Sequence, residues 1–174
     1  MVSPMPWFDS FPAQHYAVNG VNIHARVGGT VGAPALLLLH GFPQTHAIWH
    51  RVAQQLVQDY WLVMPALRGY GDSSQPVGLP DHANYSKRVM AADMAELMRL
   101  LGFNSYFVCG HDRGGRVAHR LALDHAGAVR KLCVIDIAPT LDMYAATDMA
   151  FARAYYHWFH LIQPSPLPEK MIGG

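Results

Sequence analysis

The fold is decided by Gly110-His111-Asp112-Arg113-Gly114. This stretch follows the apolar run 105–109 and precedes a segment with helical spacing, residues 115–125, so it lies at a strand-to-helix turn. In such a turn, a nucleophile elbow, strained backbone pushes the central side chain out at the carboxyl end of a sheet, and small flanking residues avoid clashes. The residue at the centre of this predicted elbow is Asp112.

An aspartate at the centre of the turn defines the chemistry that the elbow can perform. Its carboxylate is ionised at neutral pH and attacks without a base to deprotonate it. The simplest electrophile for a carboxylate is a saturated carbon that bears a leaving group. The product is an alkyl ester on the protein, so the sequence predicts covalent catalysis by Asp112.

The amino-acid composition limits the classes of protein to which this chain can belong. The 174 residues are 51% hydrophobic and 14% charged, which predicts a soluble globular chain with a sizeable core. A net charge of +1 with scattered basic residues gives no case for nucleic acid or an anionic membrane. The start of the chain, residues 1–7, has no signal-peptide pattern, and Cys109 and Cys133 each fall in a predicted buried strand as free thiols. We expect a cytoplasmic protein.

Strands and helices alternate along the chain. Asn19-Gly20 predicts a hairpin turn between two strands. The alternation then predicts an α/β fold with a mainly parallel sheet and helices on both faces. The elements we expect are strands at 15–18, 21–27, 35–39, 61–65, 105–109 and 129–137 and helices at 46–59, 85–101 and 115–125. Asp112 and Asp136 would both lie at the carboxyl ends of parallel strands.

The helix at 85–101 shows which of its faces is apolar. Met90, Met94, Leu97 and Leu101 recur at helical spacing and predict its core face, whereas Asp93 falls elsewhere. The glycine-rich loop before this helix, residues 68–73, lacks the Gly-Lys-Ser/Thr ending of a nucleotide-binding loop.

The loop His40-Gly41-Phe42-Pro43 comes directly after the apolar strand 35–39. A loop at this place can offer a backbone N–H to an oxyanion hole, with Gly41 allowing close approach and Phe42 supplying the donor. A plain tight turn is the alternative interpretation.

Three motifs, at 40–44, 68–73 and 110–116, together resemble the α/β-hydrolase superfamily in its dehalogenase and epoxide-hydrolase branch. Within that branch the chain most resembles the fluoroacetate (haloacetate) dehalogenases, over nearly its whole length. Haloalkane dehalogenases and epoxide hydrolases typically carry Trp directly after the nucleophile, and this chain has Arg113 there.

Arg113 and Arg116 are three residues apart, so they can face the same way on the first turn of the helix after the elbow. Two guanidinium groups beside a nucleophile are suited to hold a small carboxylate substrate. The alternative is that one of them pairs with Asp112 or with a surface acid.

The resemblance implies further roles. Asp112 would displace halide, and Asp136 would orient a histidine base. His157 and Trp158 would donate N–H groups to the departing halide, and the oxyanion hole would use the N–H groups of Phe42 and Arg113. A surface histidine and an aromatic contact are the alternatives for His157 and Trp158. No zinc-binding spacing occurs, so we expect neither a metal nor a cofactor.

The resemblance also implies a division of the chain. Residues 1–140 correspond to the N-terminal part of the α/β-hydrolase core and residues 141–174 to the beginning of a helical cap, with the C-terminal part of the fold and the base histidine missing. The predicted function is hydrolytic dehalogenation of small 2-halo carboxylic acids, stalled at the ester. An epoxide hydrolase and a truncated, non-catalytic hydrolase-like module are the alternatives, and a homodimer stays open.

Overall fold

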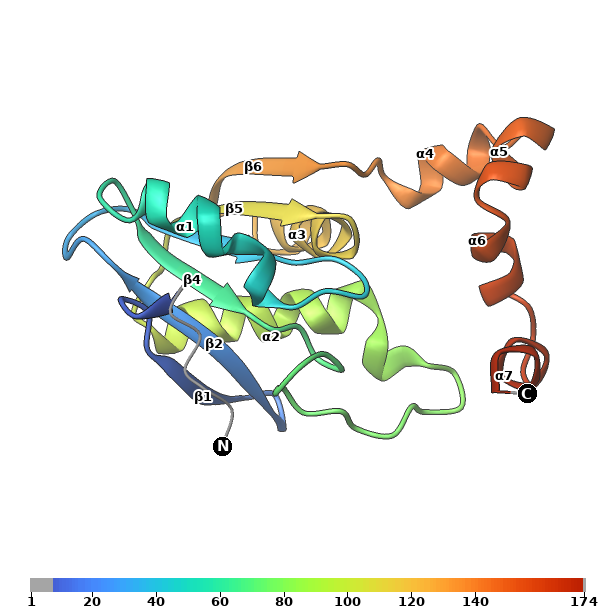
Figure 1. Ribbon diagram of the computed structural model, residues 1–174, viewed down its shortest axis with the longest axis horizontal. Coiled ribbons are helices and arrows are strands. Elements are labelled where there is room, and N and C mark those ends of the chain that lie inside the picture. Colours follow the sequence, from blue (N-terminus) through green and yellow to red (C-terminus); the bar gives the residue numbers. More distant parts are fainter. Residues whose placement is uncertain (1–7, 174) are drawn as a thin grey trace. The chain divides into compact units, whose positions relative to one another are not determined.

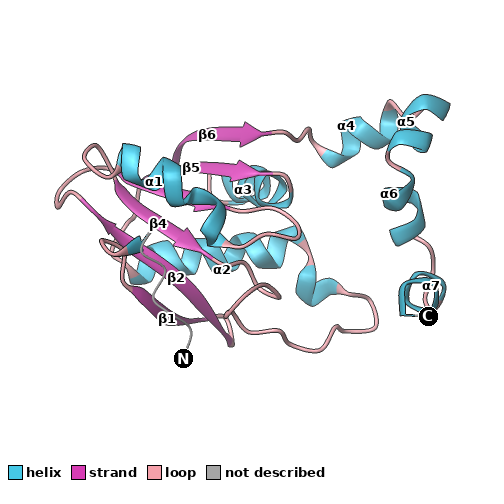
Figure 2. Ribbon diagram, in the orientation of Figure 1, coloured by secondary structure: helices cyan, strands magenta, loops and turns pink. Residues whose placement is uncertain are grey.

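The computed structural model describes residues 8–173 and contains one six-stranded sheet (Figures 1 and 2). The strand order is β1-β2-β4-β3-β5-β6. The pairs β1–β2 and β2–β4 are antiparallel, whereas β4–β3, β3–β5 and β5–β6 are parallel. The strands are β1 (Ala13–Val18), β2 (Val21–Gly29), β3 (Ala35–Leu39), β4 (Trp61–Pro65), β5 (Tyr106–His111) and β6 (Val129–Ile135). The predicted mainly parallel α/β fold is confirmed.

Helices cover both faces of this sheet (Figure 1). One face packs against α2 (Lys87–Leu100) and α3 (Arg113–Asp124), and the other against α1 (His50–Leu56) and the 3-10 turn η2 (His46–Trp49). The run 35–39 is buried throughout because its alternate side chains enter both layers: Leu37 and Leu39 face α2 and α3, whereas Leu36 and Leu38 face α1.

Three local predictions differ from the structure. The segment 46–59 is not one helix but η2 followed by α1. Cys133 was predicted to be buried, but β6 pairs only with β5 among the described residues, and this edge strand leaves Cys133 exposed. Asp93 was predicted off the core face of α2, yet it is fully buried because Arg68 pairs with it inside the core.

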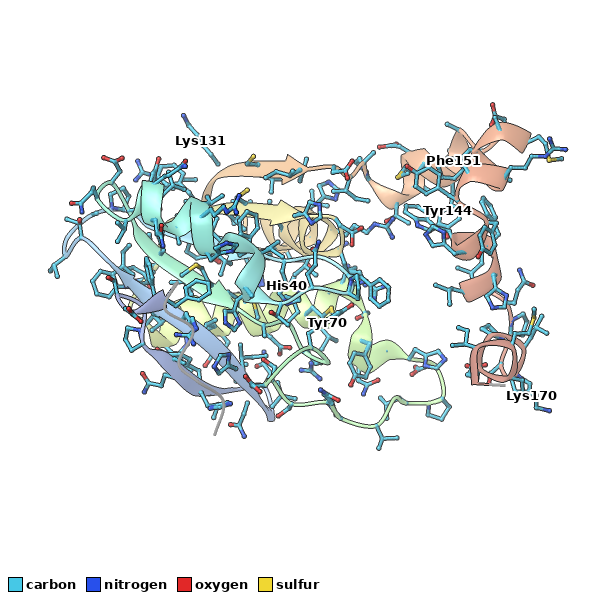
Figure 3. The ribbon with its side chains drawn as sticks, in the orientation of Figure 1. His40, Tyr70, Lys131, Tyr144, Phe151 and Lys170 are labelled. Atoms are coloured by element: carbon cyan, nitrogen blue, oxygen red, sulfur yellow. The ribbon has the colours of Figure 1, made fainter. Side chains whose placement is uncertain are left out.

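The chain divides into two compact units, one ending at Ile137 and the other beginning at Ala138. The second unit contains the short helices α4 (Thr140–Ala145), α5 (Met149–Ala154), α6 (Tyr156–Leu161) and α7 (Leu167–Gly173). Aromatic side chains hold α4, α5 and α6 together: the Tyr144 ring lies 5.7 Å from that of Trp158, and the Phe151 ring 6.0 Å from that of Phe159 (Figure 3 labels Tyr144 and Phe151).

Candidate active site

The turn between β5 and α3 has the backbone that a nucleophile elbow requires. Asp112 has φ 48° and ψ −117°, a positive-φ conformation that non-glycine residues rarely adopt. Glycine is required beside it: a Cβ on Gly110 would overlap the Gly114 carbonyl, and one on Gly114 would overlap the carbonyls of Leu39 and His40. The strained turn therefore exists because its flanking residues allow backbone to touch backbone.

The loop after β3 meets the Asp112 side chain directly. The backbone N–H of Phe42 donates a hydrogen bond of 2.9 Å to Asp112 Oδ2. Close approach depends on Gly41, where an added Cβ would lie 2.8 Å from the same oxygen. The structure thus places the Phe42 donor on the carboxylate, and the second predicted donor, the Arg113 N–H, stays a prediction.

Buried polar groups fix the shape of this loop. His40 Nε2 accepts a hydrogen bond of 2.9 Å from the Leu67 N–H, so its Nδ1–H donates to the Gly41 carbonyl at 2.8 Å. Burial lowers the pKa of His40, which keeps the ring neutral for this arrangement. Gln44 Oε1 accepts from the Gly41 N–H at 3.3 Å and from His111 Nδ1 at 3.1 Å, which ties the loop to the elbow.

Arg113 directly follows Asp112 as the first residue of α3, and its guanidinium lies over an aromatic ring. Its Cζ is 5.3 Å from the centre of the Phe42 ring. Burial raises the pKa of Tyr70, and Arg113 opposes that rise. The Tyr70 ring in turn packs edge-on to His40 at 5.1 Å (Figure 3). Within residues 8–173 Arg113 forms no ion pair with an acid.

An open cavity of about 340 Å³ lies against Arg113. Its lining joins the loop after β3, the loop after β4 and the start of α2, and consists of Phe42, Arg68, Gly69, Tyr70, Gln75, Tyr85, Met90 and Arg113. Arg116 is half-buried on the same first turn of α3 as Arg113. The two arginines therefore share one helical turn beside Asp112, as their spacing predicted.

Lys87, the first residue of α2, is a site-proximal cation that the sequence did not reveal. It is half-buried, and its pKa is lowered to about 8, chiefly by desolvation. The charges of Arg113 and Arg116 contribute to this lowering, whereas Asp112 opposes it. The one available signal was a lysine at the start of a helix, where the helix dipole disfavours a cation.

Asp136 directly follows β6 and has a positive φ of 53°. The strand before it is in register with the elbow: His111 pairs with Ile135, and the Asp112 N–H donates 3.1 Å to the Ile135 carbonyl. The sheet therefore brings the backbone of Asp136 next to that of the elbow, as predicted, and its role as an orienting acid stays a prediction.

His157 and Trp158 both belong to α6 in the second unit. Trp158 packs among the aromatic rings there, 5.7 Å from Tyr144 and 5.8 Å from Tyr155. His157 is exposed, with its ring 6.1 Å from that of Tyr155. Trp158 thus makes the aromatic contacts that were given above as the alternative to halide binding. Halide binding by either residue stays a prediction.

Neither a metal site nor a membrane-spanning helix is found in the described part of the chain. Residues 8–173 contain no group of three or more His, Cys, Asp or Glu side chains arranged to hold a metal ion. None of the helices described is long and apolar enough to cross a membrane.

Comparisons with known proteins agree with this geometry. Residues 34–173 match the family described as the alpha/beta hydrolase fold. A fluoroacetate dehalogenase from Burkholderia sp. is 55% identical over 95% of this chain and 54% of its own length, and a soluble epoxide hydrolase from Corynebacterium sp. (strain C12) is 39% identical over 71% and 41%.

The solved structures agree as well. A hydrolase structure from Nostoc sp. PCC 7120 superposes with a TM-score of 0.90 at 53% identity, over 95% of this chain and 56% of that one. The chain spans about half the length of the curated relatives it matches. Since the family model matches residues 34–173, most of the chain, the chain belongs to the α/β-hydrolase fold family.

Proposed function

We propose that this chain carries the ester-forming half of a reaction that removes halide from small 2-halo carboxylic acids such as fluoroacetate. The observation that carries the proposal is the contact between Asp112 and the Phe42 N–H, with Arg113 held over the Phe42 ring beside them. A carboxylate nucleophile is thereby brought together with an arginine that has no acidic partner among residues 8–173. The similarity to a fluoroacetate dehalogenase supports the same substrate class.

The covalent step follows from the two oxygens of Asp112. The Phe42 N–H holds Oδ2, which leaves Oδ1 to attack the carbon that bears the halogen. The new C–O bond forms as the carbon–halogen bond breaks, and halide leaves with the electron pair. When water later adds to the ester carbonyl, the Phe42 N–H would stabilise the charge that develops on Oδ2.

The arginines select for a carboxylate substrate. Guanidinium groups bind carboxylates through paired hydrogen bonds, and their charge offsets the repulsion between the Asp112 carboxylate and an anionic substrate. The Phe42 ring lies against the Arg113 guanidinium, which favours one orientation of that group before substrate arrives.

Completion of the cycle needs a base that activates water for ester hydrolysis. The histidines after Asp136 are His157 and His160, both in the aromatic helix α6. We propose that neither serves as this base, so that these 174 residues form the ester and then stall.

An epoxide hydrolase is the second candidate, because a soluble epoxide hydrolase is among the relatives. Both activities use the same elbow, and they differ in the charge of the substrate. An epoxide is neutral and gains nothing from Arg113, whereas a haloacetate is an anion.

The test is to measure fluoride released from fluoroacetate per mole of chain, followed by peptide mapping of the adduct. We expect at most one equivalent of fluoride and one carboxymethyl group on the peptide that contains Asp112. Asp112→Asn should release none, and Arg113→Met should slow release of fluoride while leaving a neutral epoxide unaffected. Fluoroacetate is preferred to chloroacetate because Cys133 is exposed and open to alkylation.

Fluoride release that continues well beyond one equivalent would show that the chain contains a base. Absence of an adduct on Asp112 in folded protein would overturn the nucleophile assignment. Ester formation from an epoxide, with none from fluoroacetate, would establish the second candidate.

A further inference from the structure

Gln44 holds the backbone of Gly41 at both of its polar groups. Its side-chain Oε1 accepts a hydrogen bond of 3.3 Å from the Gly41 N–H, and its own backbone N–H donates 3.1 Å to the Gly41 carbonyl. The His40 imidazole donates to the same carbonyl at 2.8 Å. Glycine has no side chain that restricts its backbone, so the conformation at Gly41 is set by these neighbours.

The orientation of Gly41 fixes the direction of the donor on Phe42. The Gly41 carbonyl and the Phe42 N–H belong to one planar trans peptide unit, in which they point in opposite directions. The hydrogen bonds that hold the carbonyl on one side therefore aim the N–H to the other side, where it donates 2.9 Å to Asp112 Oδ2. A rotation of this peptide unit would move the donor away from the carboxylate.

A second hydrogen bond joins Gln44 to the residue before the nucleophile. His111 Nδ1 lies 3.1 Å from Gln44 Oε1, the oxygen that already accepts from the Gly41 N–H. An amide oxygen carries no proton, so the hydrogen in this contact belongs to the histidine, and His111 is held with its proton on Nδ1. The loop and the histidine approach closely here, since a Cβ on Gly41 would lie 3.0 Å from His111 Nδ1.

Gln44 thereby connects two segments that are 67 residues apart in the chain. His111 is the last residue of β5, pairs with Ile135 in the sheet and directly precedes Asp112. The sheet fixes the position of His111, and the loop after β3 is attached to this fixed point through a single oxygen. The contact between the Phe42 N–H and Asp112 therefore depends on a side chain that neither residue carries.

We propose that Gln44 is a positioning residue for the covalent step, whose amide oxygen binds the N–H of Gly41 and the Nδ1–H of His111 together and so keeps the Phe42 N–H on Asp112 Oδ2. The inference rests on the proposed function and adds a residue that acts through the main chain of Gly41. The position requires an acceptor for two donors. Glutamate meets this requirement at the same length, whereas leucine leaves the N–H of the buried Gly41 without its acceptor.

The test begins with NMR spectroscopy of the full chain without substrate. At about pH 8, above the ordinary pKa of histidine, the nitrogen spectrum of the His111 imidazole should show the proton on Nδ1 in the unaltered chain and in Gln44→Glu. In Gln44→Leu the proton should move largely to Nε2, the nitrogen that carries it in free histidine. The Phe42 amide proton, which donates to a carboxylate, should resonate downfield, and Gln44→Leu should shift it towards its position in Asp112→Ala, where that acceptor is removed.

Single-turnover fluoride release from saturating fluoroacetate then measures the consequence for the covalent step. Gln44→Leu should slow this release by about tenfold, the factor expected when one hydrogen bond to the reacting carboxylate is lost. Gln44→Glu should restore most of the rate. The matched control is Gln54→Leu, the same substitution at an exposed residue of α1, which should change neither the rate nor the two NMR signals.

The outcomes separate this inference from the proposed function. If the unaltered chain shows both NMR signals but forms no ester, the proposed function fails. If Gln44→Leu leaves the His111 proton and the Phe42 signal where they are in the unaltered chain, Gln44 does not position the donor and the inference is overturned, even where the midpoint of thermal unfolding falls.

Should Gln44→Leu fail to fold, the unaltered chain and Gln44→Glu decide the question. A proton on His111 Nδ1 in both supports the inference, because only an acceptor at residue 44 holds it there. A proton on Nε2 in the unaltered chain overturns the inference, since Gln44 Oε1 would then lack its second donor.

Discussion

Replacing Asp93 by leucine would leave the buried Arg68 guanidinium without its acid. The two side chains form a two-point ion pair in which Arg68 Nε and Nη2 each donate 2.9 Å to Asp93, and their side chains are only 7% and 0% exposed. Asn19 Nδ2 donates a further bond of 3.2 Å to the same carboxylate. Water therefore has little access to either charge.

The magnitude follows from this burial. Removing one partner of a buried pair typically costs about 3–5 kcal/mol, because the remaining charge stays desolvated. That is a large share of the ~5–15 kcal/mol by which a domain is stable. The double replacement Arg68→Met with Asp93→Leu removes both charges and should recover most of the loss. Arg68 also lines the cavity beside Arg113, so the single variant should disturb that cavity too.

Urea denaturation followed by circular dichroism measures these changes, with the free energy of unfolding compared at constant m. The matched control is Arg88→Met, which breaks the exposed pair with Asp124 and should change stability by at most about 0.5 kcal/mol. Two results would refute the reasoning: a cost below about 1 kcal/mol for Asp93→Leu, or a double variant no more stable than the single one. Either would mean that the two charges are not desolvated together.

Three further predictions concern pH, close approach and strain. Burial, the neighbouring histidines and Arg26 lower the pKa of His46 from 6.5 to about 4, so the unfolded chain binds the His46 proton more readily than the folded chain does. Up to about 3 kcal/mol of the free energy of unfolding should therefore be lost as the pH falls from about 6.5 to about 4. In urea denaturation, His46→Phe should reduce this dependence of the free energy of unfolding on pH. Gly41→Ala should slow fluoride release in a single turnover by about a hundredfold, because the added Cβ would lie 2.7 Å from Asp112 Cβ. Gly127→Ala, which adds a Cβ in open space, should leave the rate of fluoride release unchanged. Equal rates for the two variants would contradict the close approach at Gly41. Asp112→Gly should raise the midpoint of thermal unfolding, because glycine relieves about 1 kcal/mol of backbone strain at this positive φ. The same variant should abolish fluoride release. A lower midpoint would mean that the turn is not strained.

The parts of the fold that the sequence predicted are those in which local pattern and tertiary environment agree. The run 35–39 is apolar at every position because both faces of β3 are covered. The sharp turn at Asp112 was recognisable because only small residues fit around it, and the structure shows the contacts of Gly110 and Gly114 that require them. Its role as a nucleophile elbow stays a prediction. The Phe42 N–H was predicted as an oxyanion-hole donor from its place after a central strand. In the structure it donates to Asp112, and its role in an oxyanion hole stays a prediction.

The parts that could not be predicted depend on residues far apart in the chain. Asp93 was misplaced because its partner Arg68 is 25 residues away, and helical spacing alone reports only which positions are apolar. Cys133 was misplaced because an apolar strand has the same sequence pattern whether it lies at the centre or at the edge of a sheet. Lys87 was missed because only the packing of α2 against α3 brings it near Asp112.

Phe42 contributes to the site through two parts of one residue. The hydrogen bond to Asp112 comes from its main chain, whereas the contact with Arg113 comes from its ring. A different side chain at this position would alter how the arginine is held and would leave the N–H donor in place. Under the proposed function, mutation at residue 42 would change substrate preference and would keep the main-chain donor, which makes this position a natural starting point for directed evolution.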